Sequence, residues 1–153
     1  MASMINDHDA IAKVVQLYID GSSLGDAAKL KEAFHPDARM FGSLAGKHAD
    51  IPIDDLIDLS VKAPLNSDGR YRGRLTQVVQ VGDAAVATVA EDGCWGTVSF
   101  VDYLSLARVV YQTRKSPSGS CRSACPPCVD GSELARVFFT FAGLVGAPMC
   151  SAC

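Results

Sequence analysis

The sequence has 153 residues, which is the length of one ordinary domain, and its 48% hydrophobic and 20% charged residues are typical of a globular protein rather than a disordered one. The net charge of -3 gives no electrostatic basis for nucleic-acid binding, and no apolar stretch is long enough to cross a membrane. The first ten residues lack the basic and apolar segments of a secretory signal, so we expect a cytoplasmic protein with reduced cysteines.

The N-terminal half has the 3.6-residue apolar period of amphipathic helices. Apolar side chains recur at three- and four-residue spacing, which predicts helices over residues 7–24, 27–34 and 53–63. Gly25 is suited to end the first helix, and Pro36 ends the second because proline cannot donate the next helical hydrogen bond. The sequence therefore predicts three helices before any long strand.

After the third helix the apolar period changes to two, which is typical of strands. A short strand is also expected at 38–42, followed by a loop with a small hairpin up to residue 52. The predicted long strands cover residues 71–81, 84–91, 97–110 and 134–141. Helices that lie to one side of an antiparallel sheet make an α+β fold.

Five of the six cysteines lie in the last third of the chain, near an irregular Cys-, Pro- and Ser-rich segment at residues 109–128. Two C-x2-C pairs, Cys125 with Cys128 and Cys150 with Cys153, have a spacing close to that of zinc ribbons. The alternative is that these are incidental thiols in an irregular insertion and in the unassigned tail 143–153. The sequence leaves this question open.

Two runs of sequence resemble a known family. Residues 14–42 (VVQLYIDGSSLGDAAKLKEAFHPDARMFG) and 82–108 (GDAAVATVAEDGCWGTVSFVDYLSLAR) are similar to the entry helices and central strands of the nuclear transport factor 2-like superfamily. The likeness is greatest to its SnoaL-like and "putative lumazine-binding" members. The resemblance implies a single domain over 1–153: a cone-shaped, curved antiparallel sheet packed on three N-terminal helices, a cystatin-like roll that encloses an apolar pocket. It also implies a homodimer that forms through the outer sheet face.

The family's last strand normally follows the preceding one through an Asp-Gly turn. Here the nearest match, Asp130-Gly131, comes about twenty residues after Arg108. Either residues 109–128 are an insertion in the last hairpin, or the sequence beyond Arg108 is a shifted reading frame. The β-forming run at 134–141 favours the insertion.

The ketosteroid isomerases belong to the same superfamily, and they stabilise an oxyanion with a tyrosine and a protonated carboxylic acid. By resemblance, Tyr18 and Asp102 occupy these two positions. The isomerase's general base corresponds to Gly42, so steroid isomerisation is not expected. Each residue also has a structural interpretation: Tyr18 could anchor a helix to the sheet, and Asp102 could face outward.

Asp37 is the third catalytic candidate, because related dehydratases and cyclases use acidic residues or histidine near the pocket mouth. Its alternative role is to cap the turn after Pro36. We expect the pocket to be lined by a set of apolar and aromatic side chains, namely Val14, Phe41, Leu56, Trp95 and Phe100.

Three hypotheses for function remain. The first is a cofactor-free lyase, cyclase or isomerase that acts on an apolar carbonyl compound through Tyr18, Asp37 and Asp102. The second is a non-catalytic domain that binds a small apolar or aromatic molecule, and the third is a dimerisation module. The sequence has no dinucleotide- or phosphate-binding motif, so no cofactor is expected, and it does not decide whether the protein is an enzyme.

Overall fold

The protein is described by a computed structural model that covers residues 4–44, 47–109 and 134–144. Most of the expected insertion and tail, and all four cysteines of the zinc hypothesis, lie outside these residues. The helices are α1 (Met4–Leu24), α2 (Ala27–Ala33) and α3 (Ile53–Lys62). The strands are β1 (Phe34–Leu44), β2 (Lys47–Pro52), β3 (Arg72–Val81), β4 (Ala84–Cys94), β5 (Val98–Val109) and β6 (Leu134–Leu144).

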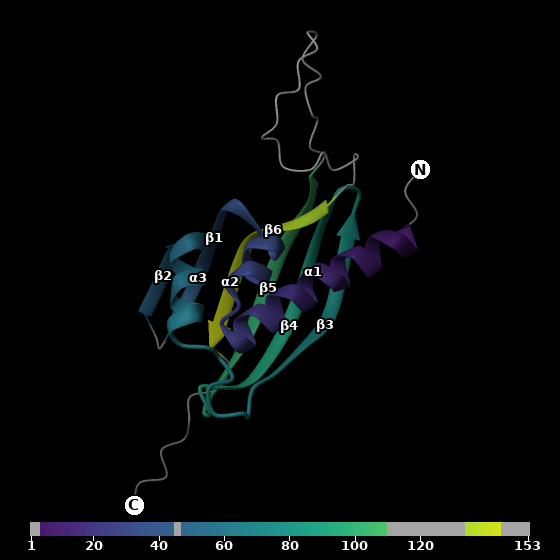
Figure 1. The fold of residues 1–153 in the computed structure, drawn as a ribbon. Coiled ribbons are helices and arrows are strands. Elements are labelled where there is room, and N and C mark those ends of the chain that lie inside the picture. Colours follow the sequence, from purple (N-terminus) through teal and green to yellow (C-terminus); the bar gives the residue numbers. More distant parts are fainter. Residues whose placement is uncertain (1–3, 45–46, 110–133, 145–153) are drawn as a thin grey trace, which may run out of the picture.

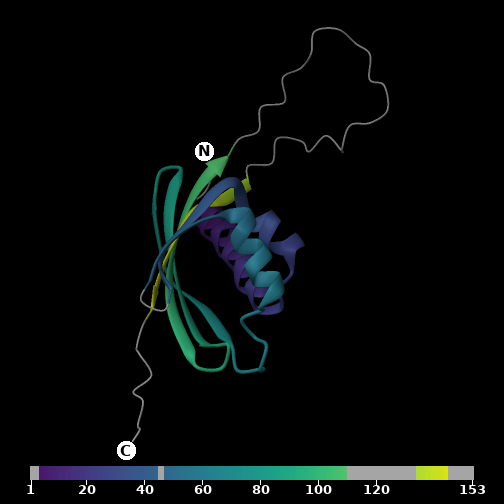
Figure 2. The same cartoon turned by 90° about the vertical axis from the view of Figure 1, so that its left-hand side faces the viewer.

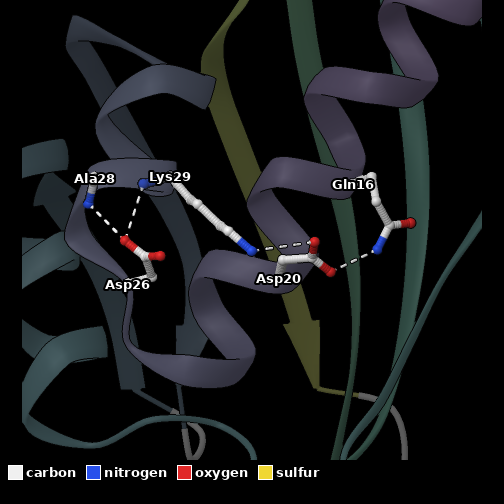
Figure 3. A network of polar contacts seen from close by, with 5 residues as sticks. All are labelled: Gln16, Asp20, Asp26, Ala28 and Lys29. Carbon is white, nitrogen blue, oxygen red and sulfur yellow. Dashed lines mark hydrogen bonds and ion pairs between the residues drawn. The ribbon is translucent and has the colours of Figure 1, made fainter.

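The junction of α1 and α2 is fixed by polar contacts (Figure 3). Asp26 is the N-cap of α2, and its carboxylate accepts from the backbone N–H groups of Ala28 at 3.0 Å and Lys29 at 3.2 Å. Lys29 lies 3.5 Å from the carboxylate of Asp20 on α1, which also accepts from Gln16 at 2.8 Å. These contacts link the start of α2 to the last turns of α1.

The six strands form one sheet in the order β2-β1-β6-β5-β4-β3. All neighbouring strands are antiparallel except β1 and β6, which are parallel. Residues 47–52, predicted as loop with a small hairpin, form the edge strand β2, and its pairing with β1 is reinforced by an Arg39–Asp50 ion pair of 2.7 Å. Pro36 is tolerated within β1 because it lies in the irregular stretch between Phe34 and Arg39.

All three helices cover one face of the sheet, and the long strands bend toward them (Figures 1 and 2). The core lies in this layer, where Ile11 and Val15 of α1 meet Ala87 and Val89 of β4 and Leu104 of β5. The α+β fold expected from the sequence is therefore confirmed. Within the described residues, none of the helices has the length and apolar character needed to span a membrane.

Candidate active site

A cavity of about 270 Å³ lies between the helices and the sheet. Its volume is close to the lower end of the ~300–1,000 Å³ range of small-molecule sites. The apolar wall is formed chiefly by Leu30, Phe34, Met40, Leu56, Ile57 and Phe100. The polar groups come from Tyr18 and Ser22 of α1, Ser60 of α3, Glu91 of β4 and Asp102 of β5.

Trp95 lines the cavity from the β4–β5 turn and is 43% exposed. Its indole Nε1 donates to the Ala63 carbonyl at 3.0 Å, and its backbone N–H donates to the Leu65 carbonyl at 2.9 Å. The ring also packs edge-to-face on Phe100 with centroids 6.0 Å apart. Trp95 has a φ of 47°, an unfavourable region for a large side chain, so these contacts hold it in place.

Tyr18 and Asp102 meet inside the cavity wall. The Tyr18 hydroxyl donates to Asp102 Oδ2, and both side chains are buried. The other carboxylate oxygen, Asp102 Oδ1, is buried and has no hydrogen-bond partner among the residues that the structure describes. A buried acceptor without a partner is costly, and such atoms are often found where a ligand binds.

Glu91 provides a second buried carboxyl group, only 2% exposed. On the paired strands Glu91 lies opposite Phe100 and Asp102 lies opposite Val89, so the two acids are diagonal neighbours on one face of the sheet. The Tyr71 hydroxyl donates to Glu91 Oε1 at 2.6 Å. The cavity wall thus contains two carboxyl groups, each hydrogen-bonded by a tyrosine.

The two carboxyl groups have different affinities for protons. Burial, and then the charge of Asp102, raises the pKa of Glu91 to about 8, although the Tyr71 hydrogen bond opposes this rise. Burial raises the pKa of Asp102 to about 6, against the opposing hydrogen bond from Tyr18. Two negative charges in an apolar wall repel each other, so the pair holds one proton near neutral pH. The site then presents one carboxylate and one carboxylic acid.

The chain also matches known proteins. A family model described as "Putative lumazine-binding" matches residues 6–111, which is most of the chain. The chain belongs to this family.

Several solved structures share the fold of this lumazine-binding-like chain. An NTF2-like protein of unknown function from Shewanella baltica is 20% identical, with a TM-score of 0.71 over 96% of this chain and 100% of the other. A similar protein from Silicibacter pomeroyi is 17% identical, with the same TM-score over 94% and 100% of the two chains. A ketosteroid isomerase-like protein from Erwinia carotovora atroseptica is 14% identical, with a TM-score of 0.58 over 91% and 96%. At these identities the likeness establishes the fold alone.

One curated relative has a named activity. Aldolase FrzH from Cladobotryum sp is 19% identical over 104 residues, which are 68% of this chain and 82% of the aldolase.

In this lumazine-binding-like domain, some of the residues predicted from the sequence to form the site line the cavity and others do not. Tyr18, Asp102, Leu56, Trp95 and Phe100 line the cavity. Three others do not: Val14 is buried in the core, Phe41 lies under the Arg39 guanidinium, and the Asp37 side chain is 90% exposed beside His35. Glu91 and Tyr71 were not among the sequence-based candidates, although Glu91 is in phase with the inward-facing Ala85, Ala87 and Val89.

A metal site is not apparent in the described part of this family member, where no group of three or more His, Cys, Asp or Glu side chains could hold an ion. The zinc hypothesis concerns cysteines outside that part and stays a prediction. The single described cysteine, Cys94, is buried, and burial raises the pKa of its thiol to about 12, which makes it unreactive at neutral pH.

Proposed function

We propose that the protein is a cofactor-free enzyme that transfers protons at the α-carbon of a neutral, largely apolar carbonyl compound, in a lyase, cyclase or isomerase type of reaction. The observation that carries the proposal is the unpartnered Asp102 Oδ1, next to the high-pKa acid Glu91 in an apolar cavity. Acid–base pairs with different pKa values in one pocket are typical of catalytic sites.

The roles follow from the protonation states. The Asp102 carboxylate removes a proton from the α-carbon, and the C–H electron pair forms the enol double bond. The carbonyl oxygen takes the proton of Glu91, which leaves a neutral enol, a protonated Asp102 and an ionised Glu91. Tyr18 keeps Asp102 in place by donating to Oδ2. This differs from the sequence-based hypothesis, in which Tyr18 and Asp102 both donate to the oxyanion.

The lining of the cavity limits the substrate. Among the described residues, no lysine, arginine or histidine lines the cavity, and the pair of acids carries a negative charge at neutral pH. An anionic ligand would therefore be repelled in a medium of low dielectric constant. A small aromatic or alicyclic ketone or aldehyde fits both the volume and the charge. The likeness to a protein named as an aldolase agrees with chemistry at a carbonyl group.

Homodimerisation in the cytoplasm remains part of the proposal. The sheet face turned away from the helices exposes Val79, Val86 and Tyr103 on three adjacent strands. Such an apolar patch is suited to pairing with a second copy.

The test is exchange of the α-protons of 2-tetralone, a neutral aromatic ketone, in D2O followed by NMR. We expect exchange faster than in buffer, with a bell-shaped pH profile whose limbs lie near pH 6 and pH 8. Asp102→Asn should reduce the rate by roughly 100-fold or more, because it removes the base.

Asp37→Asn is the matched control, since it makes the same change in an exposed carboxylate, and its rate should be that of the wild type. Loss of exchange in Asp37→Asn but not in Asp102→Asn would overturn the assignment. Binding of 2-tetralone without exchange would contradict the enzyme and favour the non-catalytic binding domain.

A further inference from the structure

Tyr71 reaches Glu91 from outside the cavity. Tyr71 precedes β3 and is not among the residues that line the cavity, whereas Glu91 is. Its hydroxyl donates to Glu91 Oε1 at 2.6 Å. The Tyr71 hydroxyl therefore engages Oε1 of Glu91 from outside the cavity, whereas Tyr18 and Asp102 approach the same carboxyl group from the cavity side.

Space for this hydroxyl depends on Gly73. A Cβ atom at Gly73 would lie 2.5 Å from the Tyr71 hydroxyl oxygen and 2.8 Å from Cγ2 of Ile19 on α1. Both distances are shorter than real Cβ contacts, so any larger residue would have to displace the side chains of Tyr71 and Ile19. The Tyr71–Glu91 contact thus requires glycine two residues beyond the tyrosine.

We propose that Tyr71, given room by Gly73, is a positioning residue that keeps the acid proton of Glu91 on Oε2. The inference rests on the proposed function, in which Glu91 is the acid. A neutral carboxyl group has a single O–H, and an oxygen that accepts a hydrogen bond from tyrosine is best used as the carbonyl oxygen. With Oε1 occupied in this way, the proton is on Oε2, the oxygen that Tyr71 does not engage.

The ionisable groups around Glu91 support this role. It is faced by Tyr18 from α1, Tyr71 before β3 and Asp102 from β5, with Cys94 further along its own strand. The hydrogen bond from Tyr71 lowers the pKa of Glu91, against the rise that burial and the charge of Asp102 cause. Burial, and then the charge of Glu91, raises the pKa of Tyr71 far above its usual value, so its hydroxyl stays protonated and remains a donor.

The first readout is independent of any substrate. The chain has three glutamates, Glu32, Glu91 and Glu133, so 13C-glutamate labelling gives few carboxyl signals, and Glu91→Gln identifies the one that matters. Wild-type Glu91 should titrate near pH 8. Tyr71→Phe should move this midpoint upward by roughly one pH unit, because a donor that stabilises the charged form is lost.

Two further variants complete the titration. Gly73→Ala should move the Glu91 midpoint in the same direction, because its new methyl group displaces the Tyr71 hydroxyl. Tyr103→Phe is the matched control, since it removes a hydroxyl from an exposed residue on the same sheet, and it should leave the midpoint in place. A midpoint in Tyr71→Phe that coincides with that of Tyr103→Phe overturns the inference, whether or not Gly73→Ala folds.

The second readout is exchange of 2-tetralone. We expect a roughly 10-fold lower kcat in Tyr71→Phe, an unchanged KM, and a basic limb of the pH profile that moves with the NMR midpoint. Normal exchange with an unmoved midpoint would refute the positioning role and leave the enzyme intact. A moved midpoint with no exchange in the wild type would support the Tyr71 contact and refute the enzyme.

Discussion

The acidic groups near the two ends of α1 have different partners. Near its start, Asp7 is paired with the Arg108 guanidinium of β5 and accepts from Gln80 Nε2 of β3 at 3.1 Å. Roughly 16 Å further along the helix axis, Tyr18 donates to Asp102, and Glu91 lies close by. The first end has a compensating cation, whereas the second has two acids and neutral hydroxyl groups.

This difference separates a structural acid from one suited to chemistry. A guanidinium beside a carboxylate compensates its charge and forms strong hydrogen bonds. Tyrosine hydroxyls compensate only in part, so burial still raises the pKa values of Glu91 and Asp102 to about 8 and about 6. The hollow beside Arg108 is also much smaller, about 50 Å³. One fold thus uses acids in two ways on the same face of its sheet.

The largest expected effect is on the pH dependence of stability. The pKa values of Glu91 and Asp102 are raised in the folded state. Their contribution to the free energy of unfolding is therefore fully present below about pH 4. It is lost as the pH rises through about 6 for Asp102 and about 8 for Glu91. Glu91→Gln cannot ionise, and it should remove a few kcal/mol of the decline in unfolding free energy between about pH 5 and pH 8. Urea unfolding at a series of pH values measures this. Parallel curves for the variant and the wild type would show that Glu91 does not titrate as described.

An intermediate effect is expected at the opposite end. Arg108→Gln removes the cation from a largely buried pair, whose side chains are 19% and 20% exposed, and should cost about 1–3 kcal/mol of unfolding free energy. Arg70→Gln is the control, because its ion pair with Asp68 is more exposed and should contribute under about 1 kcal/mol. Equal losses in the two variants would remove the contrast between the ends of α1.

The smallest effect concerns the neutral partner of Asp7. Gln80→Ala removes the hydrogen bonds of the Gln80 amide to Asp7 and to the exposed Gly82 carbonyl and leaves the Arg108 ion pair in place, so it should cost only about 0.5–1 kcal/mol in the same unfolding measurement. A loss as large as that of Arg108→Gln would mean that the amide, not the charge, holds this end together.

Local sequence patterns were sufficient for the helices and for most strands, because amphipathic periods depend on neighbours in the chain. The same pattern contains the signal for Glu91, which continues the inward alternation of Ala85, Ala87 and Val89. An acid at an inward-facing strand position is itself a sign of a functional site. Asp102 is likewise an acid within an inward-facing row of β5, where Phe100, Leu104 and Leu106 are also buried.

Other features could not be predicted from local pattern. Strand β2 exists because it pairs with β1, and the contact of Tyr71 with Glu91 joins residues twenty positions apart. The placement of β6 between β1 and β5 depends on pairings across most of the chain. The exposure of Asp37 likewise follows from how β1 sits in the finished sheet.

The position of β6 has a consequence for how the molecule acquires its shape. Strand β6, which follows the other five strands in the sequence, bridges β1–β2 to β3–β5, so the sheet cannot join its two halves until β6 has been synthesised. Pairings between distant parts of a chain raise the contact order and slow folding. We therefore expect the nascent protein to expose apolar strand surfaces until β6 has emerged and paired, and to bind chaperones before that point.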